Sequence, residues 1–125
     1  MDKAALVSLD IEAGSRVVSV LENAGLPIKV ALWMATPEYE EGRLVLASPR
    51  LDQTAPLHAY EQVAETLQGE FSYSPPAILI LRMKDPFIQQ LRQLFGKTRS
   101  VDGMRLGGQM IGNRFISEGY VYKIT

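Results

Sequence analysis

The segment 28–36 constrains the fold more than any other, because it has the alternation of a strand without a polar face. Alternate positions place Ile28, Val30, Leu32 and Met34 on one face and Ala31, Trp33 and Ala35 on the other. A strand at the edge of an antiparallel sheet would normally carry polar residues on its wet face. We therefore predict that this segment lies in the interior of a sheet, with Trp33 in the core.

The other apolar residues predict the remaining elements. Spacings of three and four predict helices at 3–24, 55–68 and 86–95, whereas short apolar runs predict strands at 43–47 and 77–81. With two strands in the C-terminal segment, the predicted order is αββαβαββ. This order indicates one α/β (α+β) domain over residues 1–125, with a mixed five-stranded sheet and helices mainly on one face.

One glycine interrupts the first helical pattern. Gly14 lies between apolar positions of the predicted helix at 3–24. A glycine there costs about 1 kcal/mol relative to alanine. The sequence therefore allows a kink, or a separate short turn before Asp10.

The segment 101–124 is rich in glycine and predicts two strands. Gly112 and Asn113 stand between two alternating runs, which is typical of a two-residue turn of type I′ or II′. The alternation places Tyr120, Tyr122 and Ile124 on one face of the last strand, and Val121 and Lys123 on the other. We expect this strand, at 117–125, to be an edge open to strand addition or dimerisation.

Composition narrows the class of protein. The chain has 125 residues, 46% hydrophobic and 22% charged, which is typical of one folded domain rather than a disordered chain. It has no cysteine, so it has no disulfide, thiolate nucleophile or cysteine-rich zinc site. No window resembles a membrane span or a secretory signal. We expect a cytoplasmic protein.

Two features resemble catalytic motifs without meeting their requirements. Gly96, Lys97 and Thr98 resemble the end of a P-loop, but Leu91 stands where the motif needs its first glycine. Gly96 is instead predicted to cap a helix. His58 could act as a general base oriented by Asp52 or Glu61, but no nucleophile motif accompanies it, so a surface position is favoured.

The densest group of acids comprises Glu38, Glu40 and Glu41. Clustered carboxylates can hold Mg²⁺ or Ca²⁺. A polar hairpin tip accounts for the same cluster, so we predict no metal site. We also predict no cofactor and no catalytic residue.

The charges are divided along the chain. Residues 1–81 carry five Lys/Arg against eleven Asp/Glu, a net of −6, whereas residues 82–125 carry eight against three, a net of +5. The candidate anion- or partner-binding residues are Lys97, Arg99, Arg105 and Arg114. Three explanations remain open: pairing within the monomer or a homodimer, an acidic protein or phosphate-bearing ligand, and nucleic acid. A pI near 5.8 disfavours the last.

These observations lead to three hypotheses of function. The first is a non-enzymatic cytoplasmic binding or assembly protein that self-associates as a dimer and recognises an acidic or protein partner through the basic C-terminal β region. The alternative is a small protein that acts on nucleic acid or nucleotides, in which the same region holds phosphates and Glu38 or Glu41 assists a metal. The third is a hydrolase built around His58.

Overall fold

The computed structural model describes residues 8–37, 39–71, 76–98 and 100–125, and the side chains of 8, 9 and 39–41 are not described. The helices are α1 (Ser8–Asn23), α2 (Pro49–Asp52), α3 (Pro56–Leu67) and α4 (Pro86–Phe95). The strands are β1 (Val30–Thr36), β2 (Tyr39–Ala47), β3 (Ile78–Ile80), β4 (Arg105–Ile111) and β5 (Arg114–Ile124). The predicted α+β class with a mixed five-stranded sheet is confirmed, and the short helix α2 is the one element that was not predicted. No helix in the described ranges is long and apolar enough to cross a membrane.

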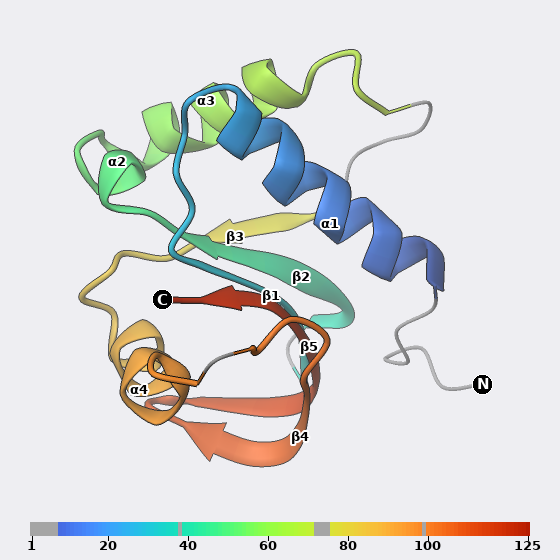
Figure 1. Cartoon of the computed structure of the whole chain (residues 1–125), viewed down its shortest axis with the longest axis vertical. Helices are drawn as coiled ribbons and strands as arrows, with labels where there is room; N and C mark the ends of the chain where they lie inside the picture. Colours follow the sequence, from blue (N-terminus) through green and yellow to red (C-terminus); the bar gives the residue numbers. More distant parts are fainter. Residues whose placement is uncertain (1–7, 38, 72–75, 99) are drawn as a thin grey trace.

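The strands are arranged in the order β3-β2-β1-β5-β4 (Figure 1). Strand β1 lies at the centre, antiparallel to both β2 and β5, which confirms its predicted interior position. Strand β3 runs parallel to β2, and β4 forms a hairpin with β5. The edges of the sheet are therefore β3 and β4.

The prediction that the last strand is an edge is wrong. Strand β5 pairs with β1 on one side and with β4 on the other. Because β1 is buried on both faces, its backbone N–H and C=O groups are cut off from water and need hydrogen-bond partners at both edges. Strand β2 pairs with one edge of β1 and β5 pairs with the other. The last strand in the sequence therefore lies inside the sheet.

Helices cover both faces of the sheet, three on one face and one on the other (Figure 1). On the first face, α1 and α3 bury Val17, Leu21 and Val63 against Ala31 and Leu46. On the second face, α4 covers a core that comprises Leu32, Met34, Phe87, Ile88 and Leu91, among others. These two cores explain why β1 is apolar on both sides.

Trp33 belongs to the core, as predicted. Its side chain is 4% exposed, and its indole nitrogen Nε1 donates a hydrogen bond to the backbone oxygen of Asp10 at 2.6 Å. The bond joins β1 to α1. A buried indole needs one partner for its N–H, and a helix carbonyl supplies it.

The predicted faces of β5 are only partly correct. Tyr120 and Tyr122 share a face, with ring centroids 5.2 Å apart. Ile124, however, lies with Val121 in the core under α4, and Lys123 reaches Glu22 of α1 on the opposite face. The pairing of β5 with β1 shifts register here, as in a β-bulge. An extra residue in one strand inverts the alternation beyond it.

The hairpin between β4 and β5 turns at Gly112 and packs against α4. Gly112 has φ 58°, whereas Asn113, like every other non-glycine residue in the described ranges, has no positive φ. This excludes type I′, which needs positive φ at both central residues, and leaves type II′ of the two predicted turns. A Cβ at Gly112 would lie 2.7 Å from the backbone oxygen of Pro86. The turn is therefore held closely against the start of α4.

Candidate functional site

The structure separates the candidate residues that the sequence singled out. Lys97 is exposed beyond the end of α4, and Arg99 lies outside the described residues. Arg105 opens β4 opposite Tyr120, whereas Arg114 opens β5 at the other end of the hairpin. At about 3.4 Å per residue, the length of β4 puts roughly 20 Å between their backbones. Arg105 and Arg114 therefore do not converge on one site.

Several basic residues of the C-terminal third pair with acids. A guanidinium nitrogen of Arg105 lies 3.7 Å from Glu118 Oε1, and the group stacks over the Tyr120 ring at 5.4 Å. Arg114 lies 3.9 Å from Asp85 Oδ2. Pairs that remain accessible to solvent, as these do, contribute about 0–1 kcal/mol each to stability. They nevertheless neutralise part of the local charge.

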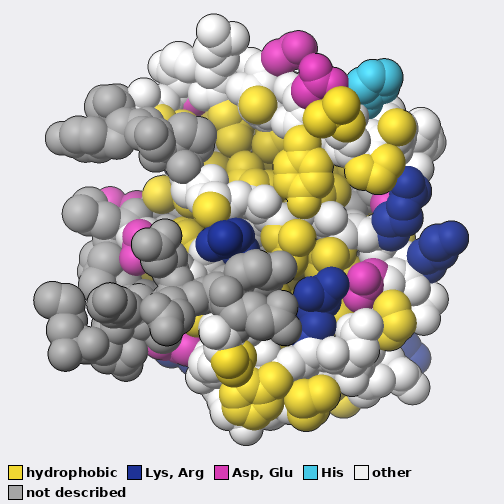
Figure 2. All heavy atoms as spheres, turned by 180° about the vertical axis from the view of Figure 1, so that it is seen from behind, with side chains coloured by type: hydrophobic (Ala, Val, Ile, Leu, Met, Phe, Trp, Pro, Cys, Tyr) yellow, Lys and Arg dark blue, Asp and Glu magenta, His cyan; other side chains and the backbone are white. Residues whose placement is uncertain are grey.

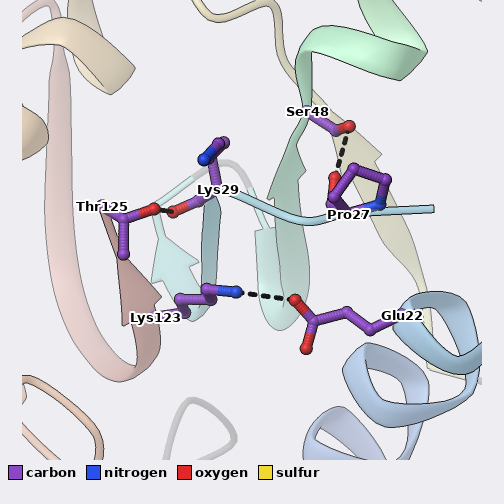
Figure 3. Close-up of polar contacts among 6 residues, drawn as sticks. All are labelled: Glu22, Pro27, Lys29, Ser48, Lys123 and Thr125. Atoms are coloured by element: carbon purple, nitrogen blue, oxygen red, sulfur yellow. Dashed lines mark hydrogen bonds and ion pairs between the residues drawn. The ribbon is translucent and has the colours of Figure 1, made fainter. Parts of the chain in front are cut away.

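One ion pair joins the acidic and basic parts of the chain directly. Lys123 Nζ lies 2.6 Å from Glu22 Oε2, between β5 and α1 (Figure 3). The pair borders a hollow of about 290 Å³ whose polar lining includes Ser15, Asp102 and Tyr122. The Tyr122 hydroxyl donates to the backbone oxygen of Ile11 at 2.8 Å, and burial raises the pKa of this phenol above its usual range. Tyr122 and the Lys123–Glu22 pair therefore hold α1 on the sheet.

The catalytic candidates remain separate from one another. His58 is exposed in the first turn of α3, where it lines a shallow depression with Glu61, and no described residue forms a hydrogen bond or ion pair with it. Asp52 accepts from the backbone N–H of Met83 at 3.1 Å. Gly96 caps α4 as predicted, since its N–H donates to the Arg92 oxygen at 2.8 Å.

The acidic cluster at the first hairpin lies outside what the structure describes. Glu38 is not described, and neither are the side chains of Glu40 and Glu41. Among the side chains that are described, no three His, Asp or Glu residues gather as metal ligands would.

A different set of cations gathers at one end of the sheet, where β2, β3 and β5 end and β1 begins (Figure 1, left). The backbone N–H of Lys29 donates to the Ala47 oxygen at 3.0 Å, and the N–H of Thr125 donates to the Lys29 oxygen at 2.9 Å. These bonds hold the strand ends together, and the Thr125 hydroxyl also donates to the Lys29 oxygen at 3.2 Å (Figure 3). We call this set the basic end; it comprises Lys29, Arg50, Arg82, Lys84 and Arg92.

Local folding places Arg50 at the basic end. Ser48 is fully buried, and its hydroxyl accepts from the Arg50 N–H at 3.1 Å, as an N-cap of α2 does. The same hydroxyl donates to the Pro27 oxygen at 2.6 Å, which anchors the start of α2 beside the entry to β1 (Figure 3). Arg50 follows as an exposed residue of α2.

Arg82 and Arg92 are fixed by backbone oxygens. A guanidinium nitrogen of Arg82 donates to the Asp52 oxygen at 3.0 Å, and Nε of Arg92 donates to the Thr125 oxygen at 2.8 Å. With the bond from Met83 to the Asp52 carboxylate, Asp52 ties the loop after β3 to α2. The two guanidinium groups are thereby held at the strand ends.

Positive charge is in excess here. The cations of the basic end lie in the segments 27–29, 48–54 and 81–92, which contain two acids, Asp52 and Asp85. Asp85 is engaged as the N-cap of α4. Lys29, Arg50 and Lys84 are exposed and form no ion pair with the described residues. Clustered charge of one sign attracts ligands of the opposite sign.

The chain also forms a crevice at the basic end. After β2 it passes to α2 and α3 on one face, whereas after β3 it passes to α4 on the other. In open α/β sheets, ligands bind outside the carboxyl ends of neighbouring parallel strands whose connections diverge in this way. A hollow of about 100 Å³ lies here, lined by Leu51, Pro56, Tyr60, Ile80 and Arg82, among others.

The sequence interpretation missed these residues because it followed the charge along the chain. Lys29 and Arg50 belong to the acidic part, so a count by segment hides them. The available signal was position, since Arg50 and Arg82 each follow shortly after a predicted strand. Residues that follow parallel strands meet at one edge of the sheet.

Comparison of this chain with family models, with curated proteins and with solved structures finds no match. The basic end is therefore a candidate site on the grounds of its geometry and charge.

Proposed function

We propose that this protein is a non-enzymatic cytoplasmic binding protein that recognises an acidic segment of a partner protein at the basic end. The observation that carries the proposal is the meeting of five cations at one end of the sheet, three of them without an ion pair among the described residues. The adjacent hollow offers apolar contacts. An acidic polypeptide can use both.

The surroundings favour a protein over nucleic acid. Apolar and basic side chains lie next to one another on the face seen in Figure 2. Leu57 is 70% exposed and Tyr60 38% exposed on α3, and the acids Glu61 and Glu65 are exposed on the same helix. A long phosphate backbone would gain little from the aliphatic surface and would be repelled by the acids. A short acidic segment avoids both costs.

The test is binding of a fluorescein-labelled polyglutamate peptide, measured by fluorescence anisotropy at low and at physiological salt. The triple variant K29Q/R50Q/K84Q should weaken binding by about tenfold, since three modest charge contacts of about 0.5 kcal/mol each sum to such a factor. The matched control K97Q/R105Q/R114Q removes the same net charge elsewhere and should leave most of the affinity. Equal losses in the two variants would assign the binding to net charge and contradict the proposal.

A labelled single-stranded oligonucleotide in the same assay tests the alternative function. Tighter binding of the oligonucleotide than of polyglutamate, with a steep salt dependence, would favour the protein that acts on nucleic acid. We expect the reverse order of affinities.

We also propose that the chain self-associates, through the edge strand β4. Met110 and Phe115 lie directly opposite each other in the β4–β5 hairpin and are 63% and 41% exposed. An exposed apolar pair beside an open edge suits an isologous contact, in which the same strand of two copies pairs.

A further inference from the structure

The outer edge of β3 presents backbone groups to solvent beside the basic end. The Leu44 N–H donates to the Ala77 oxygen at 2.8 Å, and the Leu81 N–H donates to the Leu46 oxygen at 3.0 Å. Ala77 and Leu81 therefore direct their backbone groups toward β2. Since these groups alternate in direction along a strand, those of Ile78 and Ile80 point away from β2.

A side chain of the protein already forms a hydrogen bond with one of these outward backbone groups. The Ile80 N–H donates to the hydroxyl oxygen of Tyr60 at 2.9 Å. In the described part of the chain, no hydrogen bond engages the N–H of Ile78. A hydroxyl on a partly exposed ring can rotate away, so the edge can accept a further strand.

The hollow beside Tyr60 supplies a place for one side chain of such a strand. Its volume of about 100 Å³ lies between Ile80 at the edge and the apolar groups of Leu51, Pro56 and Ala59. This volume equals that of about three water molecules in the liquid. A single aliphatic side chain fits this space.

The charge next to the edge specifies the chemistry of the occupant. Arg82 and Lys84 lie two and four residues after the end of β3, and Arg50 stands across the crevice in α2. A strand that pairs with β3 would continue past these cations. A second copy of this chain would bring the same cations to the contact, so it does not supply the negative charge.

We propose that an extended acidic peptide of a partner protein adds to the sheet as a strand along β3. The peptide backbone forms hydrogen bonds with the backbone groups of Ile78 and Ile80. One aliphatic side chain of the peptide enters the hollow beside Tyr60, and its carboxylates face Arg82 and Lys84. This inference rests on the proposed function and names the ligand conformation. Because β3 has three residues, few backbone bonds form, and the side chain and charges supply the remaining affinity.

The test is a titration of the ¹⁵N-labelled protein with an acetylated peptide of alternating Glu and Val. We expect the largest amide shifts at Ile78, Ile80 and Arg82, and slower hydrogen exchange at Ile78. The same peptide with N-methyl groups at alternate residues cannot pair along the strand and should lose most of its binding. Polyglutamate, which lacks an aliphatic side chain, should bind more weakly.

One variant gives an effect of opposite sign. Y60F removes the hydroxyl that competes for the Ile80 N–H, so the Glu-Val peptide should bind about three- to tenfold more tightly, the worth of one hydrogen bond. The control A64S changes another exposed residue of α3 outside the hollow and should have little effect. Weaker binding by Y60F would overturn the pairing with Ile80.

The failures of the two proposals are distinguishable. If the N-methylated peptide and polyglutamate bind as well as the Glu-Val peptide, with shifts confined to Arg50, Arg82 and Lys84, strand addition is wrong and recognition of acidic segments stands. If none of the three peptides binds even at low salt, both proposals fail.

Discussion

The phenol of Tyr122 occupies the space that a side chain at Gly14 would need. A Cβ at Gly14 would overlap the Tyr122 hydroxyl and lie 2.6 Å from its Cζ. The hydroxyl donates to the Ile11 oxygen one turn earlier in α1. Helix α1 runs without interruption from Ser8 to Asn23. The glycine is therefore explained by a close contact between helix and sheet, and no break separates it from Ser8. The predicted start of this helix at residue 3, and a separate turn before Ser8, lie outside the described residues.

The variant G14A should lower the free energy of unfolding, although alanine is the better helix former. The gain in helix propensity is about 1 kcal/mol. The forced displacement of the half-buried ring costs about 1–3 kcal/mol. The difference is a net loss of up to about 2 kcal/mol, which urea denaturation measures.

Two further variants make this comparison decisive. S15A changes the exposed neighbour and should alter stability little. In a Y122L background, where the ring is absent, G14A should become neutral or stabilising. A stabilising effect of G14A in the original chain would show that the ring does not restrict this position.

The half-buried phenol of Tyr122 should make the protein less stable at alkaline pH. Burial, followed by the nearby Tyr120 and acids, raises the pKa of Tyr122 above its ordinary value of 10.0. Above that value the unfolded chain loses this proton while the folded chain keeps it, so the free energy of unfolding falls as pH rises, by up to about 1.4 kcal/mol per pH unit. The stabilising contribution is fully present below pH 10.

The measurement is the free energy of unfolding of the original chain and of Y122F from neutral pH to above pH 10. Y122F should lack this part of the decline, and its spectrophotometric titration should lose the tyrosine that ionises last. Parallel stability curves for the two proteins would contradict a Tyr122 that stays protonated in the folded chain.

Sequence periodicity predicted the elements well, because burial on one or two faces is a local property. The two apolar faces of β1 correctly predicted a central strand, and Asp85 followed by Pro86 marked the start of α4. The position of β5 was not predictable in this way, since a strand's neighbours depend on the path of the whole chain. The change of face at Ile124 has a similar origin, because a bulge leaves no mark in the alternation itself.

The candidate site was less predictable than the fold. The charge split suggested a basic surface, but Arg105 and Arg114 lie at opposite ends of a hairpin. The basic end draws Lys29 and Arg50 from the acidic part of the chain and Arg92 from a helix. Only the pairing of the strand ends brings them together, and that pairing is a property of the sheet topology.

The close approach of the second hairpin to α4 can be tested with two glycines of equal φ. Gly108 and Gly112 both have φ 58°, but a Cβ at Gly108 would meet nothing within 4 Å, whereas one at Gly112 would lie 2.7 Å from the Pro86 oxygen. G108A should cost about 1–2 kcal/mol for the left-handed conformation alone. G112A should cost about 1–3 kcal/mol more, for the displacement of α4.

Urea denaturation of both variants checks this difference. Because the two glycines share the same positive φ, the difference in stability between the variants reports mainly the contact with α4. Equal losses would mean that the turn and helix separate at little cost. That result would contradict tight packing of the hairpin against Pro86 and Phe87.

The proposed self-association through β4 predicts a dimer that depends on the apolar pair of the hairpin. The original chain should run as a dimer in size-exclusion chromatography with light scattering at micromolar concentration, and M110E/F115E should run as a monomer, since two acids would face two acids across the contact. The control L94E places an acid at an exposed apolar position of α4, 50% exposed, and should remain dimeric. A monomeric original chain would contradict self-association, whereas a dimer that resists M110E/F115E would place the contact on another surface.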